Sequence, residues 1–228
     1  FTDRRQRQMC IRDRVANVKD LSDKIKQKYS KIDVLLNNAG GANKTKQITI
    51  EGLEKTFATN QMNYFVLSTE LLEIISESND GRIVNVASNA HIGAEVDYEN
   101  INSEKNFSAW TSYCVSKLMN IMFTYQLSSI QDKVSANVLH PGFVDTNIAG
   151  NEGNFIKYIV KLGAKMFART VDSGADSSIY LSTSDEVQNV SGKYFFKCKE
   201  IKSSRASYNK EDWQKVWDLC NEYKIKLI

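Results

Sequence analysis

The chain has 228 residues, 42% hydrophobic and 25% charged, which suffices for one sizeable globular core and excludes a disordered chain. Its formal net charge of +3 is misleading. Residues 1–14 hold five Arg and two Asp, and removing these from 30 basic and 27 acidic residues leaves 25 of each. A neutral body argues against a nucleic-acid-binding protein.

Residues 1–14, "FTDRRQRQMCIRDR", form an Arg-rich tail unlike the rest of the chain. A nucleic-acid arm and a transit peptide are alternatives, but no aromatic residues interleave the charges and no apolar stripe accompanies them. The tail opens on Phe, so we interpret it as a non-native segment. We expect residues 15–228 to form the domain.

The four cysteines form no CxxC pair, and His91 and His140 are isolated. Neither a metal site nor a disulfide framework is therefore expected, and the cysteine usage fits a reducing compartment. No run of about 18 apolar residues is present. We expect a cytoplasmic protein, or one at the cytosolic face of an intracellular membrane.

Helices and strands alternate from Val15 onwards. Apolar residues at helical spacing predict helices over residues 16–30, 53–78 and 111–130. Short apolar runs that end in Asn, Ser or Gly predict strands within residues 31–40, 81–88 and 133–142, and residues 89–107 read as a polar loop. This alternation predicts an α/β fold with a parallel sheet, and such sheets bind ligands beside the carboxyl ends of their strands.

Tyr113 and Lys117 stand four positions apart in "SYCVSKLMN", so they share one face of the third predicted helix. A phenol with a pKa of about 10 is a poor acid or base near neutrality, but a nearby ammonium lowers that pKa. The pair then suits proton transfer to or from a carbonyl or alcohol oxygen. The alternative is that Tyr113 packs in the core while Lys117 extends to solvent.

Ser88 ends the strand "GRIVNVAS". A hydroxyl at a strand's carboxyl end can donate a hydrogen bond to the same substrate oxygen and stabilise its developing charge. Its alternative role is that of a cap or turn residue.

These residues resemble the short-chain dehydrogenase/reductase family, and within it the retinol dehydrogenase-like members. Five motifs follow in the family's order: "NNAG" at 37–40, "FATNQMNYF" with Asn60, "VNVAS", "YCVSK" and "HPGFVDT". The resemblance runs from about Val15 to the carboxyl terminus. It implies a Rossmann-like doubly wound parallel sheet.

The resemblance also implies the roles of individual residues. Tyr113 would donate the proton, Lys117 would lower its pKa and hold the nicotinamide ribose, Ser88 would polarise the carbonyl, and Asn60 would help to relay protons through water. The cofactor, NADP(H) rather than NAD(H), would contact a further set of residues: Asn37, Ala39, Gly40, Pro141, Gly142, Val144 and Thr146.

The chain departs from the family at its start, because its first glycine is Gly40. A dinucleotide fold needs a glycine-rich turn after its first strand, so that the backbone can approach the pyrophosphate. We therefore expect a sheet that is missing its first strands and this turn, with the strand "DVLLNN" left at an edge.

Two functions from different classes compete. The first is an oxidoreductase that moves a hydride between NADP(H) and a small lipophilic carbonyl or alcohol, retinoid-like, with residues 155–168 covering the substrate. The second is a catalytically silent binding or regulatory protein on a truncated Rossmann sheet. The resemblance also suggests a homodimer through the helices that flank the active site, and the basic amphipathic segment 155–168 suggests peripheral membrane contact.

Overall fold

A five-stranded sheet forms the centre of the protein, in a computed structural model that describes residues 14–142 and 171–228. The strands follow one another in the sheet in chain order: β1 (Val34–Asn37), β2 (Gly81–Val86), β3 (Val134–Leu139), β4 (Tyr194–Phe196) and β5 (Lys199–Ile201). The first four are parallel neighbours, and β5 is antiparallel to β4. The predicted α/β fold and its three strands are confirmed, whereas the β4–β5 pair was not predicted.

The helices include the three that the sequence predicted. Those described are α2 (Val15–Lys28), α3 (Lys55–Phe57), α4 (Asn63–Ser76), α5 (Ala109–Ile130), α7 (Val171–Thr183) and α8 (Lys210–Leu227). The segment predicted as one helix over residues 53–78 is not a continuous α-helix, because the π-helical turn Ala58–Met62 joins α3 to α4. It also begins later, at Lys55, because the Glu54 carboxylate caps it by accepting hydrogen bonds from the backbone N–H groups of Thr56 and Phe57.

Helices cover both faces of the sheet. Ile83 in β2 and Ala136 in β3 pack into the large core that α4 and α5 share. Val84 and Val86 in β2 point to the opposite face, where they pack with Leu181 of α7. Because neighbouring strand residues point to opposite faces, β2 is buried along its whole length between two helical layers.

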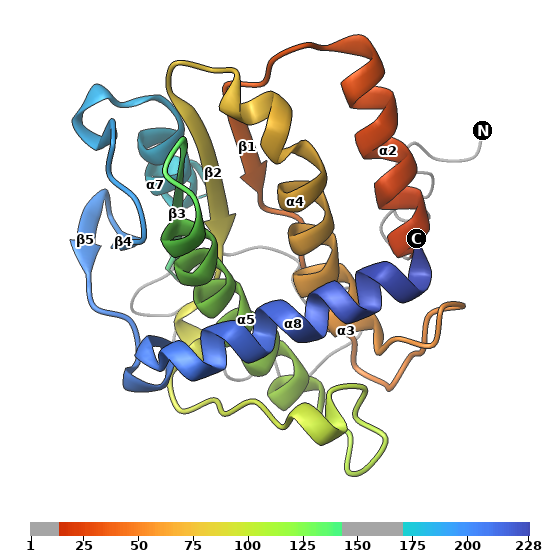
Figure 1. Ribbon diagram of the computed structural model, residues 1–228. Helices are drawn as coiled ribbons and strands as arrows, with labels where there is room; N and C mark the ends of the chain where they lie inside the picture. Colours follow the sequence, from red (N-terminus) through yellow and green to blue (C-terminus); the bar gives the residue numbers. More distant parts are fainter. Residues whose placement is uncertain (1–13, 143–170) are drawn as a thin grey trace.

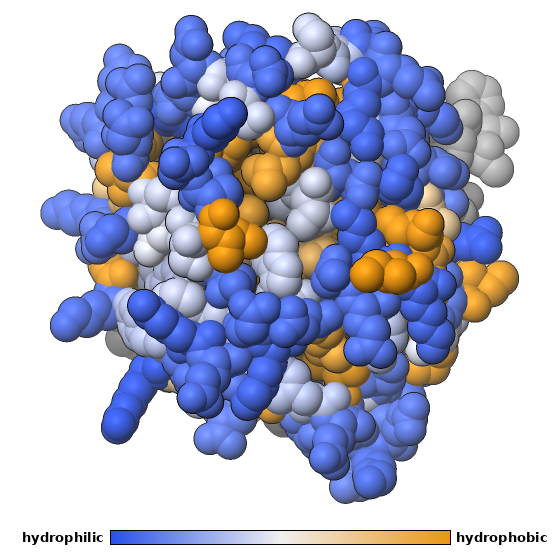
Figure 2. All heavy atoms as spheres, viewed as in Figure 1, coloured by the Kyte–Doolittle hydropathy of each residue, from blue (hydrophilic) through white to orange (hydrophobic). Residues whose placement is uncertain are grey.

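The C-terminal helix α8 lies across α5 and α4 (Figure 1). Its Trp217 ring stacks on Phe123 of α5, with ring centroids 5.9 Å apart, and contacts Phe65 of α4 edge-on at 5.1 Å. On the face of the molecule that α8 crosses, hydrophilic side chains predominate and apolar ones appear in small separate groups (Figure 2). The homodimer through the helices that flank the active site stays a prediction.

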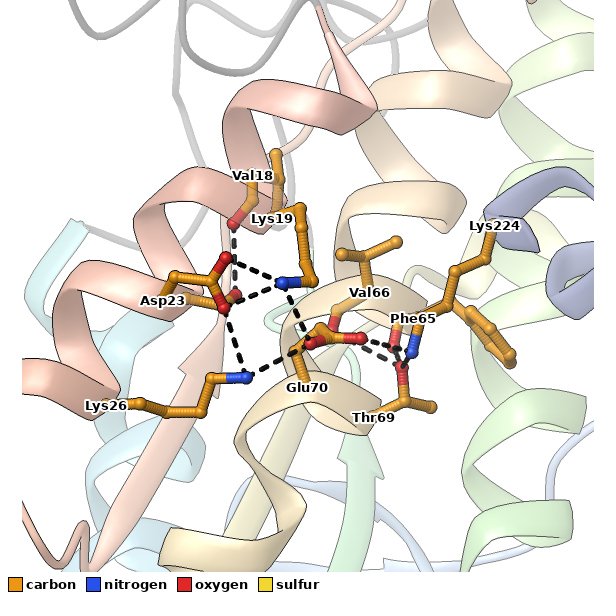
Figure 3. A network of polar contacts seen from close by, with 10 residues as sticks. Val18, Lys19, Asp23, Lys26, Phe65, Val66, Thr69, Glu70 and Lys224 are labelled. Atoms are coloured by element: carbon orange, nitrogen blue, oxygen red, sulfur yellow. Dashed lines mark hydrogen bonds and ion pairs between the residues drawn. The ribbon is translucent and has the colours of Figure 1, made fainter. Parts of the chain in front are cut away.

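Glu70 of α4 ties α2 and α8 to the rest of the helical layer (Figure 3). Its carboxylate pairs with Lys26 of α2 at 3.2 Å and with Lys224 of α8 at 2.5 Å. Burial raises the pKa of Glu70, but hydrogen bonds from Lys224 and Lys26 outweigh it and leave the pKa below its ordinary value. The ionised carboxylate thus fastens three helices together.

Strand β1 forms one edge of the described sheet and pairs only with β2. The edge position that the sequence predicted for "DVLLNN" is confirmed for the described residues, and the Leu36 side chain is 43% exposed there. No helix in the two described ranges combines the length and the apolar character needed to cross a bilayer.

Candidate active site

The carboxyl ends of β1, β2 and β3 meet at one edge of the sheet. Asn37 lies opposite Asn85 in the β1–β2 register, and Val86 lies opposite Leu139 in the β2–β3 register. The backbone N–H of Ala87 donates to the carbonyl of Leu139 at 2.7 Å. The segments that leave these strands therefore start side by side, as predicted.

Ser88 and Tyr113 come together at this edge. Ser88 ends the β2 segment, where its Oγ accepts a hydrogen bond from the backbone N–H of Ala90 at 3.2 Å. Tyr113 lies near the start of α5, which begins after the N-cap residue Ser108. The Tyr113 phenol is partly buried and lies close enough to Ser88 for the serine hydroxyl to lower its pKa. The sequence separates these hydroxyls by 25 positions, and the fold unites them.

Lys117 extends into the protein beneath Tyr113 and is only 4% exposed. Its Nζ donates to the backbone carbonyl of Val86 at 2.9 Å and to Asn120 Oδ1 at 3.2 Å. It lies 5.9 Å from the centre of the Tyr113 ring and 5.4 Å from that of Tyr64. Burial lowers the pKa of Lys117 to about 7, because a charged amine loses its hydration there. The alternative in which Lys117 extends to solvent is wrong.

The acidity of Tyr113 differs from the sequence-based expectation. Burial raises the pKa of Tyr113, and the Ser88 hydroxyl offsets this only in part. The Lys117 amine makes its hydrogen bonds to Val86 and Asn120 and not to the phenol, so its lowering of the Tyr113 pKa stays a prediction. At neutral pH the phenol of this arrangement therefore keeps its proton.

Asn60 is fully buried in the π-helical turn and clamps the loop that follows β1. Its Oδ1 accepts from the backbone N–H of Gly41 at 2.9 Å, and its Nδ2 donates to the carbonyl of Gly41, also at 2.9 Å. The same Nδ2 donates to Ser116 Oγ on α5 at 2.9 Å. The side chain thus holds a loop against α5, and the water-mediated relay expected from the sequence stays a prediction.

The loop after β1 passes close to Lys117. A Cβ atom added to Gly40 would lie 3.0 Å from Asn60 Oδ1 and 3.3 Å from Lys117 Nζ, so only glycine allows this approach without displacing either side chain. Ala39 and Gly40 are exposed, whereas Asn37 is buried and donates to Asn85 and Ser68. The Oδ1 of Asn37 lacks a hydrogen-bond partner. A polar ligand beside this loop would find open backbone and one unpaired acceptor nearby.

The third strand end carries Pro141 and Gly142, both partly buried. Gly142 has φ +82°, a backbone conformation that favours glycine, and its N–H donates to His140 Nδ1 at 3.2 Å. The other cofactor contacts predicted here, Val144 and Thr146, lie outside the described residues, as does the segment 155–168.

Two further residues hold the site together, and the sequence analysis did not assign them a role. His91 Nε2 accepts from the backbone N–H of Ser204 at 2.9 Å, and its Nδ1 lies 2.7 Å from the carbonyl of Ser88, to which it must donate. Asn120 binds Lys117 from one helical turn away. The signal for Asn120 was its spacing of three from Lys117, which places both on one helix face.

The chain is similar to known proteins of one family. The family described as short chain dehydrogenase matches residues 6–156. Human "Retinol dehydrogenase 14" is 34% identical over 93% of this chain and 64% of its own length. Human "Polyprenol dehydrogenase" is 31% identical over 89% of this chain and 64% of its own length. The chain thus spans less than two thirds of each curated relative.

Among solved structures, a gluconate 5-dehydrogenase from Burkholderia cenocepacia J2315, in complex with NADP and tartrate, has a TM-score of 0.59 and 19% identity. That similarity covers 81% of this chain and 70% of the other, and it supports the fold. With the family match spanning most of the chain and the relatives above 30% identity, the chain belongs to the short-chain dehydrogenase/reductase family and is retinol dehydrogenase-like.

Proposed function

We propose that this chain carries the catalytic part of an oxidoreductase that transfers a hydride between NADP(H) and a lipophilic carbonyl or alcohol. One observation carries the proposal: the Tyr113 phenol lies close enough to Ser88 for that hydroxyl to lower its pKa, and its ring centre lies 5.9 Å from the buried amine of Lys117. This arrangement provides a proton donor, a second hydroxyl for the same oxygen, and an amine that faces the loop at Gly40.

Ser88 and Tyr113 would act together on the oxygen atom of the substrate. The Tyr113 phenol would donate its proton to the oxygen of a carbonyl as the carbon is reduced, and Ser88 would stabilise the charge that develops there. Burial raises the pKa of the phenol, so at neutral pH it carries the proton that it would donate in the reducing direction. Positioned proton transfer of this kind is typically worth about 10²- to 10⁴-fold in rate.

The residues present fit the nicotinamide end of a dinucleotide. Lys117 would hold its ribose. The cofactor would run along Asn37, Ala39 and Gly40, and its nicotinamide end would be bordered by Pro141, Gly142, Val144 and Thr146. When bound, the nicotinamide supplies or accepts the hydride. The close approach at Gly40 and the unpaired Asn37 Oδ1 support this fit, and Asn60 contributes by fixing Gly41. The preference for NADP(H) over NAD(H) rests on the family resemblance and on the NADP in the similar solved structure.

A small lipophilic substrate is supported by the relatives named for retinol and polyprenol. We place the protein in the cytoplasm or at the cytosolic face of an intracellular membrane. Segment 155–168 supplies the apolar residues that would cover the substrate and touch the membrane.

A chimera tests the proposal, because this polypeptide has no glycine before Gly40. The residues before Val15 are replaced by the corresponding N-terminal portion of human retinol dehydrogenase 14. Turnover of retinal with NADPH is then measured for the chimera and for its Tyr113→Phe form. We expect Tyr113→Phe to lower kcat by at least about 100-fold while the protein still folds.

The matched control is Tyr125→Phe, the same chemical change in the same helix, at a phenol bonded to Ser203 and not to Ser88. It should leave kcat within about twofold, because it touches no part of the site. Equal turnover for the chimera and its Tyr113→Phe form would refute the proposal. A folded chimera that binds NADPH but turns over no aldehyde or alcohol would favour the silent binding protein.

A further inference from the structure

Asn120 lies one helical turn beyond Lys117 on α5 and is fully buried. Its Nδ2 donates two hydrogen bonds, to the backbone carbonyl of Asn60 at 2.8 Å and to Gln61 Oε1 at 2.9 Å. Its Oδ1 accepts from Lys117 Nζ at 3.2 Å. One amide therefore connects the lysine to the π-helical turn.

The orientation of this amide is fixed by its partners. A backbone carbonyl can only accept a hydrogen bond, so the atom facing Asn60 must be the nitrogen of Asn120. Gln61 reinforces the choice, because its own Nε2 points to Cys220 Sγ of α8 at 3.6 Å and leaves its oxygen toward Asn120. A reversed amide would set oxygen against two acceptors, so Oδ1 is held toward Lys117.

Two oxygens on opposite elements consequently fix the Lys117 amine, Val86 O at the end of β2 and Asn120 Oδ1 on α5. They use two of its N–H directions. The remaining direction, whether it carries a third N–H or the lone pair of the neutral amine, is then determined by tetrahedral geometry. Without these two acceptors the flexible four-carbon side chain of Lys117 would adopt several rotamers, and the remaining direction would not be fixed.

We propose that Asn120 is a positioning residue that holds the Lys117 amine in its working orientation through the π-helical carbonyl of Asn60. The proposal rests on the proposed function for the role of Lys117, but the anchoring itself does not depend on turnover. Asn120 touches neither substrate oxygen nor hydride, so it acts only through Lys117. The π-helical turn contributes to this arrangement, because it exposes the backbone carbonyl of Asn60 to the Asn120 side chain on α5.

The test follows the lysine directly in the chain as it exists, without cofactor. Lysine labelled with ¹³C at Cε is titrated by NMR, and Lys117 is assigned by the loss of its signal in Lys117→Met. Asn120→Asp places a carboxylate beside the amine, so the pKa of Lys117 should rise by about 1 to 3. Asn120→Leu removes an acceptor that favours the charged amine, so the pKa should fall below that of the wild type.

The matched control is Asn137→Asp. Asn137 is likewise buried and bonded to backbone groups, those of Val190 and Lys193, on the far side of β3. Its replacement should leave the titration of Lys117 unchanged. A merely structural role for Asn120 would not move the pKa of Lys117 in opposite directions in the two variants.

A measurement on the unaltered protein decides the matter if a variant does not fold. The side-chain amide signals of Asn120 should shift with the same midpoint as Lys117, while those of Asn137 should not. Asn120 amide signals that do not follow the midpoint of Lys117, or a folded Asn120→Asp protein with an unchanged lysine midpoint, would overturn the proposal. Because no turnover is measured, either result is separate from success or failure of the chimera.

Discussion

Replacing Lys117 by Met should change how the stability of the protein depends on pH. The pKa of Lys117 is about 7 in the folded protein, against an ordinary value of 10.5. Between these values the unfolded chain binds one proton more than the folded protein, so the free energy of unfolding rises with pH across this window. Below about pH 7 both states bind the proton, and the penalty for burying the amine is present in full.

The magnitude follows from the same two values. Each pH unit corresponds to about 1.4 kcal/mol, so the full window from 10.5 to about 7 amounts to roughly 5 kcal/mol as an upper bound. Met has a similar shape but no charge, and it removes this dependence. It also leaves the oxygens of Val86 and Asn120 without their donor, at about 1–3 kcal/mol each, but that cost does not vary with pH.

Urea unfolding followed by tryptophan fluorescence, at several values between about pH 7 and pH 10, measures the effect. The free energy of unfolding of Lys117→Met minus that of the wild type should decrease steadily as the pH rises. Subtraction removes the contributions of other titrating groups. Lys193→Met, at an exposed lysine paired with Glu200, controls for the loss of a lysine and should give no such trend. A constant difference for Lys117→Met would show that the amine is not desolvated.

Four other outcomes are expected. Leu36→Lys should reduce aggregation measured by light scattering, because a charge on the open edge of β1 opposes strand pairing; a monodisperse unaltered protein would contradict this. Trp217→Ala should lower the free energy of unfolding by about 3 kcal/mol in urea, since its ring packs on α4 and α5, and a loss below about 1 kcal/mol would mean that α8 is loosely held. Glu70→Gln should lower the free energy of unfolding near pH 6, and progressively less as the pH falls below 4.5. The lowered pKa of Glu70 means that only its ionised form stabilises the folded protein, and urea denaturation of both proteins at about pH 3 and pH 6 measures the difference. NADPH should bind this polypeptide weakly in a fluorescence titration, because no glycine-rich turn precedes Gly40. A submicromolar Kd would show that tight binding does not need this turn.

The sequence by itself determined where most helices and strands before residue 140 lie and which two functional residues share one face of α5. Apolar periodicity located α2, α5 and strands β1 to β3, because these segments bury the faces that their own spacing defines. A spacing of four placed Tyr113 and Lys117 together, and the order of motifs indicated the family. After β3 the spacing assigned no element, so α7, the β4–β5 pair and α8 come from the structure alone.

Only the tertiary structure decided what those residues experience. The hydrogen bond from Asn120 reaches Asn60, which is 60 positions away, and no local pattern encodes such a contact. The pKa of Lys117 depends on how completely α4, β2 and α5 exclude water from one amine, and desolvation is a property of the assembled core. Spacing along a helix therefore predicted which groups meet, whereas packing between distant segments set whether they carry a proton.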